Sequence, residues 1–299
     1  MQQLLNNNPL ILMEAAIVEQ LRRSSDIHLH KTLVNAPLIY EESSGKVMAQ
    51  LYQNYIDIAN ENKLPFLMLT PTWRTNKSRV FDSEMSKNIN IDAVRFMKDI
   101  RDSNSNKKAI KIGGLIGCKN DCYRPEEGLN AAEAETFHAW QIDQLKQGGV
   151  DFLIAQTLPF LEEAIGIAKA MEASGLPYII SFVIDRKGVV LDGTSLYDAV
   201  CKIDAATNRN PLGYMVNCAY PSFLCPSQQP KALFSRFIAY QANASSLDQC
   251  ELDNADELQV DEVADWGEIM LTLHRSYGIK MLGGCCGTGS EHLRYIVDH

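Results

Sequence analysis

Several features are absent from the sequence, and each absence excludes a class of protein. No apolar run approaches the ~18 residues that a membrane-spanning helix needs, so we expect no membrane partner. The N-terminus has no cationic stretch, and Glu14 and Glu19 interrupt its apolar residues, which argues against a signal peptide. Basic residues are in the minority, 28 against 37 acidic ones, and the formal charge of −9 disfavours nucleic acid as a partner. We therefore expect a cytoplasmic protein.

The chain also has no Gly-x-Gly-x-x-Gly turn after an early strand. This absence argues against a nicotinamide oxidoreductase and weakens, without excluding, a doubly wound sheet. There is no internal repeat, low-complexity tract or linker, so residues 1–299 are expected to form a single domain. With 46% apolar and 22% charged residues, the chain can bury a sizeable core.

Short apolar runs rich in β-branched and aromatic residues recur along the chain. Runs without strict alternation are typical of strands buried on both faces of a parallel sheet. They cover residues 10–13, 64–70, 109–117, 150–157, 177–184, 212–218, 237–243 and 279–284. Amphipathic stretches with helical spacing lie between them, at residues 46–60, 130–147, 162–174, 194–205 and 261–277. This order predicts an α/β fold, a single (β/α)8 TIM barrel.

Two segments interrupt this regular pattern. Residues 14–23 (EAAIVEQLRR) follow the first strand and predict one continuous helix. Residues 241–259 are polar and predict a long loop.

Eight cysteines are too few for a disulfide scaffold and more than packing needs in a reducing compartment. Cys218 ends one apolar run, and Cys285 and Cys286 end another between glycines. In a barrel, both strand ends lie at the C-terminal face, where active sites form. Three thiolates suit Zn²⁺, whose fourth position would stay open for a substrate; the alternative is that these cysteines only fill the core. The other five are interpreted as packing or surface residues, with a minor redox role left open for the first two: Cys118, Cys122, Cys201, Cys225 and Cys250.

These motifs resemble the homocysteine S-methyltransferase family over nearly the full length of the chain. The resemblance rests on GGCCGT at 283–288 with VNC at 216–218, and is supported by TPTW at 70–73, SF at 181–182 and DGTSL at 192–196. It implies a zinc-containing barrel enzyme in which the metal holds the thiol of homocysteine while that thiol accepts a methyl group, yielding methionine. It also implies that Cys218, Cys285 and Cys286 are the zinc ligands.

The resemblance further implies a set of substrate-binding residues, with Trp73 a candidate for one wall of a site for a methylated cation. They are Glu14, Thr72, Trp73, Gln156, Thr157 and Asn217. Each also has an ordinary structural interpretation, as a helix-surface acid, a strand-end polar group, or a loop or core residue.

Two of these positions depart from the family pattern. Glu14 stands where the family has an aspartate, and the glycines that follow it are replaced by alanine and valine. Gln156 stands where the family has a glutamate that contacts the amino group of homocysteine. Loss of that charge would weaken homocysteine binding, or it indicates a different thiol as the acceptor. If the ammonium lies at this position, Gln156→Glu is expected to improve its binding.

The methyl donor stays open among S-methylmethionine, S-adenosylmethionine, betaine and the methyl groups of folate or corrinoid systems. No second domain for folate or cobalamin is evident, so the donor is expected to act alone or to arrive on a separate methyl-carrier protein. A homo-oligomer also stays open. The alternative function is a diverged, non-catalytic barrel that binds zinc or a thiol and serves a partner.

Overall fold

The computed structural model describes residues 1–247 and 260–299, and in this part of the chain eight parallel strands close into a barrel. Each strand pairs with its neighbours in chain order, and the last pairs with the first. The strands are β1 (Ile11–Met13), β2 (Phe66–Leu69), β3 (Ile110–Ile116), β4 (Phe152–Leu158), β5 (Tyr178–Phe182), β6 (Gly213–Asn217), β7 (Phe237–Ala242) and β8 (Met281–Gly284). The predicted (β/α)8 TIM barrel is confirmed.

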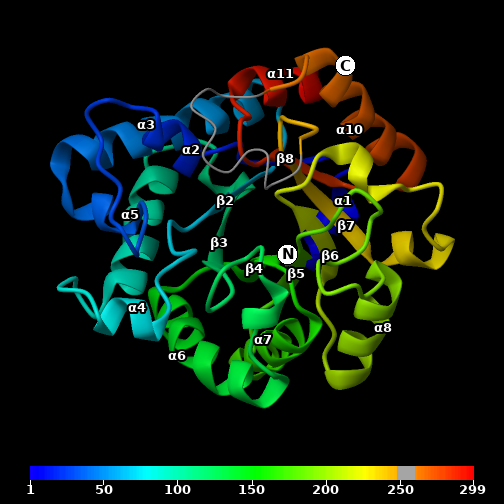
Figure 1. Ribbon diagram of the computed structural model, residues 1–299. Coiled ribbons are helices and arrows are strands. Elements are labelled where there is room, and N and C mark those ends of the chain that lie inside the picture. Colours follow the sequence, from blue (N-terminus) through cyan, green and yellow to red (C-terminus); the bar gives the residue numbers. More distant parts are fainter. Residues whose placement is uncertain (248–259) are drawn as a thin grey trace.

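Helices surround the barrel on the outside (Figure 1). The α-helices are α1 (Gln2–Asn7), α2 (Val18–Arg22), α3 (Glu42–Glu61), α4 (Lys77–Phe81), α5 (Ile89–Asp102), α6 (Ala131–Gly148), α7 (Leu161–Ser174), α8 (Leu196–Ala206), α10 (Val263–Tyr277) and α11 (Ser290–Asp298). Short 3₁₀ turns lie at Ala36–Tyr40, Lys107–Ala109, Pro125–Glu127, Pro221–Leu224 and Lys231–Ser235. No helix in the described ranges is long and apolar enough to cross a membrane.

The core has two layers because successive side chains of a strand point to opposite faces. Ile11 and Met13 of β1 face the barrel interior, whereas Leu12 between them packs against the surrounding helices. The ring of Phe152 fills the interior beside β3, where a Cβ on Gly113 would lie only 2.5 Å from it. Helix α1 contributes Leu5 to the same inner cluster. The barrel is therefore a packed core, and its site must lie at an end.

Local sequence signals fix the ends of several helices. The side chain of Asn130 accepts a hydrogen bond of 3.0 Å from the Glu133 amide and caps the start of α6. Gly149 ends the same helix in the left-handed conformation, with φ of 83°, and Gly175 ends α7 in the same way. Asn130 ends a loop at the C-terminal face of the barrel, whereas Gly149 and Gly175 begin the short loops that lead into β4 and β5 at the opposite end.

The helix predicted for residues 14–23 is wrong in its first half, because only Val18–Arg22 is helical. The Glu14 side chain is buried against the next strand, and the backbone of Ala16 is bonded to distant residues. Its amide donates to Thr288 Oγ1 at 3.2 Å, and its carbonyl accepts from the Tyr55 hydroxyl at 2.8 Å. These tertiary bonds occupy backbone groups that a helix would need.

The long loop predicted for residues 241–259 is also wrong at its start. Gln241 and Ala242 are buried and form the last two positions of β7. Residues 248–259, including Cys250, lie outside the described residues.

Candidate metal centre

Three cysteines converge at the C-terminal face of the barrel. Cys218 directly follows β6, and Cys285 and Cys286 directly follow β8. Their three sulfur atoms all lie within 4.8 Å of one another, and no other such group of metal-binding side chains occurs among the described residues. The sulfurs of Cys218 and Cys285 are in direct contact as a disulfide, with Cα atoms 5.5 Å apart, and Cys286 is exposed beside them.

The end of β7 holds both cysteine-bearing strands in place, because β7 lies between β6 and β8 in the sheet. The Cys218 amide donates to the Gln241 carbonyl at 3.2 Å, and the Cys285 amide donates to the Ala242 carbonyl at 2.7 Å. The carbonyl of Cys286 accepts from the Ala244 amide at 2.9 Å. All three cysteines are therefore tied through the backbone to one short segment.

The donor set suits zinc. Soft thiolate ligands select metals such as Zn²⁺, and three of them leave a fourth tetrahedral position for a substrate atom. Only the reduced form of the Cys218–Cys285 pair can supply two thiolates. The Asn217 amide group donates to the Cys218 sulfur at 3.3 Å, and the Thr157 hydroxyl lies 3.9 Å from the same atom. Such hydrogen bonds orient a ligand and stabilise its anionic form.

Thr157 and one of the three cysteines, Cys218, have strained backbones. Thr157 has φ of 59° and Cys218 has φ of 54°, in the left-handed region that a β-branched residue rarely adopts. The Asn217 side chain links them. Its Oδ1 accepts from the Thr157 amide at 2.8 Å and from the Ser181 hydroxyl at 2.6 Å, while its Nδ2 donates to Thr157 Oγ1 at 2.7 Å. Strain of this kind persists only where the surroundings hold it, and it clusters at functional sites.

Glu14 lies next to this centre at the end of β1. Its Oε2 accepts from the Leu69 amide at 2.7 Å, and its carbonyl accepts from the Gly284 amide at 3.0 Å. Burial raises the pKa of the Glu14 carboxyl to about 8, against the opposing effect of the Leu69 hydrogen bond. The carboxyl is therefore largely protonated at neutral pH. The predicted acid is present in the barrel mouth, but it carries little charge there.

Gln156 is buried in β4 and reaches across the barrel. Its Nε2 donates to Oε1 of Gln241, and Nε2 of Gln241 donates to the Glu14 carbonyl at 3.2 Å. The structure thus joins Glu14 and Gln156 through a residue that the sequence did not single out. Gln241 could have been found, because it stands near the end of an apolar run, as Gln156 and Cys218 do.

Thr72 and Trp73 lie in the loop after β2, and no described contact joins their side chains to the cysteine sulfurs. Thr72 is fully buried and donates to the Leu115 carbonyl at 2.6 Å. The guanidinium of Arg74 lies over the Trp73 ring, 4.0 Å from its centroid. One face of this ring is already occupied by a cation of the protein itself, so a methylated donor could stack only on the other. The role predicted for Trp73 stays a prediction.

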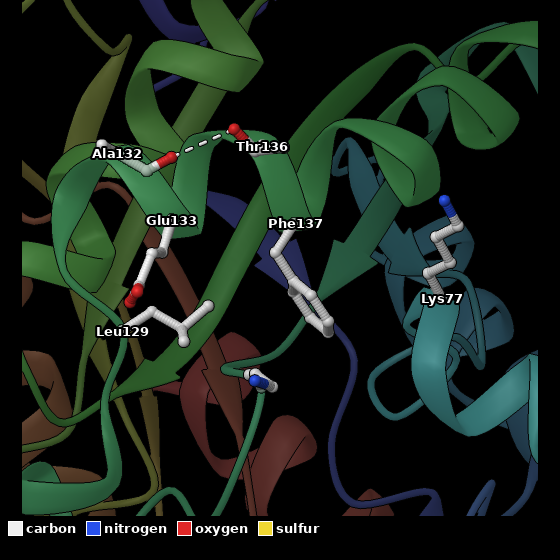
Figure 2. A pocket seen from close by; sticks show the side chains of 7 residues that line it. Lys77, Leu129, Ala132, Glu133, Thr136 and Phe137 are labelled. Carbon is white, nitrogen blue, oxygen red and sulfur yellow. Dashed lines mark hydrogen bonds between the residues drawn. The ribbon is translucent and has the colours of Figure 1, made fainter.

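A separate cleft of about 780 Å³ lies between α4 and the N-terminal half of α6. Figure 2 shows the Phe137 ring projecting into it, with Lys77 on the opposite wall. Lys119 also lines the cleft, with its ammonium 5.2 Å from the centroid of the Phe137 ring. None of the predicted site residues lines this cleft.

The fold and the cysteines together define a class: an α/β barrel with a cluster of three cysteines at the C-terminal ends of its strands. The chain belongs to the homocysteine S-methyltransferase family, whose family model matches residues 11–299. It is therefore a methyltransferase, and membership supports methyl transfer to homocysteine.

Individual relatives are distant in sequence. Homocysteine S-methyltransferase YbgG of Bacillus subtilis is 23% identical over 99% of this chain and 96% of its own length. Betaine–homocysteine S-methyltransferase 1 of Mus musculus is 23% identical over 64% of this chain, which spans about half of that relative (48%). The solved structure of the homocysteine methyltransferase MmuM from Escherichia coli, in its metallated form, superposes with a TM-score of 0.76 at 17% identity, covering 99% of this chain and 98% of its own. This structural likeness shows a shared fold.

Proposed function

We propose that the protein is a zinc-dependent S-methyltransferase that moves a methyl group from an activated donor to a thiol, homocysteine being the acceptor and methionine the product. The observation that carries the proposal is the convergence of the three sulfurs of Cys218, Cys285 and Cys286 at the C-terminal face, in a chain of this family. That one domain, residues 1–299, carries the activity is part of the proposal.

Cys218, Cys285 and Cys286 would hold the ion. When bound, zinc favours the thiolate form of an acceptor thiol, whose pKa is otherwise near ~8.5. Three protein thiolates around a divalent ion give a net charge of −1, which keeps electron density on the acceptor sulfur. No general base is then required. The hydrogen bond from Asn217 to the Cys218 sulfur would hold that ligand in its orientation.

The six predicted substrate residues separate into three pairs under this proposal. Glu14 and Gln156 are buried at the ends of their strands, are joined through Gln241, and would contact the amino-acid end of the acceptor. Thr157 and Asn217 are bonded to each other and to Cys218, so they would position the metal ligand. Thr72 and Trp73 would act from the loop after β2, on the side of the methyl donor.

The donor is proposed to be a small molecule with a methyl group on sulfur or nitrogen, arriving free or from a separate carrier protein. S-methylmethionine, S-adenosylmethionine and betaine all carry such a group beside a formal positive charge. A reducing cytoplasm is the proposed location, because it would keep the three cysteines as thiols.

The test is a metal analysis of the reduced protein followed by methyl-transfer assays with these donors and homocysteine. We expect one zinc per chain and formation of methionine with at least one donor. Cys286→Ser should lose both, whereas Cys201→Ser, at an exposed cysteine of α8, should lose neither. Stoichiometric zinc with no transfer to any thiol would favour the non-catalytic barrel.

A further inference from the structure

Gln241 lies at the mouth of the barrel, where its side chain joins two of the predicted site residues. The proposed reaction has so far given it no role. It is 4% exposed, and it sits at the same level as Asn217 of β6 and Gly283 of β8. Its side chain bonds to Glu14 and Gln156, and its carbonyl accepts the amide of Cys218. Since β4 and β7 are separated by two strands in the sheet, the bond to Gln156 crosses the barrel.

The orientation of both carboxamides follows from one backbone group. The Glu14 carbonyl can only accept, and it accepts from the Gly284 amide and from Nε2 of Gln241. Gln241 must therefore point its nitrogen at Glu14 and its oxygen at Gln156. Gln156 must in turn point its nitrogen at Gln241. Its own Oε1 makes no hydrogen bond with any described residue, and the side chain keeps 8% of its surface exposed.

This arrangement excludes an ionised carboxylate at position 156. A glutamate there would face Oε1 of Gln241 with an acceptor, and two acceptors repel each other. If Gln241 turned its amide over, its oxygen would face the Glu14 carbonyl instead. A glutamate at 156 could donate to Oε1 of Gln241 only in its protonated, neutral form, so the pairing favours that form.

We propose that Gln241 is a specificity-determining residue, which holds the neutral Gln156 side chain through its nitrogen and leaves the Gln156 carbonyl oxygen for the acceptor. The inference rests on the proposed function, because it assigns that oxygen to the amino-acid end of a thiol. The acceptor's amino group then meets a neutral oxygen. A neutral oxygen holds an ammonium about half as strongly as a carboxylate does. The site therefore discriminates only modestly in favour of thiols that carry an amino group.

This inference changes the expectation for Gln156→Glu, which on sequence grounds should improve homocysteine binding. With Gln241 intact, the added acid stays neutral and KM for homocysteine should not fall. Gln241→Met keeps the length of the side chain and removes both hydrogen bonds. In that background, Gln156→Glu should ionise against the ammonium and lower KM for homocysteine by about tenfold.

The kinetic test compares two thiol acceptors, homocysteine and 4-mercaptobutanoate, the second of which lacks the amino group. Both are measured with the zinc-loaded wild type, the two single variants and the double variant. Relative to Gln241→Met alone, the double variant should lower the ratio of the homocysteine KM to the 4-mercaptobutanoate KM by about tenfold. A tenfold fall in homocysteine KM for Gln156→Glu with Gln241 intact would overturn the inference.

A second measurement needs no catalysis and separates this inference from the proposed function. Denaturant unfolding of the same four zinc-loaded proteins, without substrate, should show that Gln156→Glu lowers the midpoint more with Gln241 present than with Met at 241. Equal shifts in the two backgrounds would contradict the inference, even if methyl transfer were established. A larger fall with Gln241 present would support the bonding between 156 and 241 even if no thiol were methylated, and a larger fall with Met at 241 would contradict it.

Discussion

At the scale of the residue, the centre depends on side chains that hold other side chains. Asn217 makes hydrogen bonds to Thr157, Ser181 and the Cys218 sulfur, so one carboxamide supports two strained backbones and one candidate metal ligand. The motif VNC predicted that Asn217 belongs to the site. Its role in holding Thr157 could not be predicted, because that contact joins strands β4 and β6.

We expect Asn217→Ala to lower kcat at least tenfold and to destabilise the fold by about 1–3 kcal/mol, because the buried Thr157 amide and Ser181 hydroxyl lose their acceptor. Steady-state kinetics and urea unfolding check the two effects. Asn208→Ala, at an exposed asparagine, serves as the control and should change neither. Full activity of Asn217→Ala would show that the strained turn needs no such support.

Glu14 should give the protein a pH-dependent stability. Its pKa rises from 4.5 to about 8 on folding, so the folded state holds a proton that the unfolded state has released in this window. The contribution of Glu14 to the free energy of unfolding is therefore most favourable below pH 4.5. It falls by a few kcal/mol as the pH rises to about 8.

Urea unfolding of wild type and Glu14→Gln between pH 5 and 8 measures this effect. The difference in unfolding free energy between the two proteins should shift in favour of the variant as the pH rises. A difference that stays constant over this range would show that the Glu14 carboxyl is not protonated in the folded protein.

At the scale of the element, the sequence predicted all eight strands, because strands buried on both faces must be continuously apolar. Helix ends followed from Asn130, Gly149 and Gly175, which carry local signals. The extended backbone after β1 could not be predicted from the sequence, because Ala15 and Ala16 favour a helix and only hydrogen bonds to distant residues prevent one. Gln241 was missed for the same reason: a polar residue at a strand end resembles the start of a loop until the opposite strand is known.

The turn after β8 is an element whose position depends on Thr288. Its hydroxyl donates to the Cys285 carbonyl at 2.6 Å and accepts from the Ala16 amide at 3.2 Å, which ties the cysteine turn to the segment after β1. Thr288→Val removes both bonds with little change in volume. We expect zinc affinity to fall by about 10- to 100-fold, as for other residues that orient ligands.

Competition with a zinc chelator under reducing conditions measures that affinity. Thr272→Val, at an exposed threonine of α10, is the matched control. Unchanged zinc affinity in Thr288→Val would mean that the backbone bonds from Ala242 and Ala244 suffice to hold the turn.

At the scale of the whole molecule, the barrel brings together residues that are far apart in the chain. Cys218 and Cys285 are separated by 67 positions, and Glu14 directly follows the first strand, yet all stand at one end of the barrel. The eight-unit pattern predicted this convergence, since consecutive parallel strands end on the same face. It could not predict the bonds across the mouth, such as the one between Gln156 and Gln241.

The central claim is that three thiolates hold a zinc ion with one position left open for the sulfur of the acceptor. Zinc-edge X-ray absorption of the reduced, zinc-loaded protein, with and without homocysteine, tests it most directly. We predict three sulfur neighbours plus one lighter atom in the free protein, and four sulfur neighbours once homocysteine is added. A zinc environment of nitrogen and oxygen, or one that homocysteine leaves unchanged, would contradict the account.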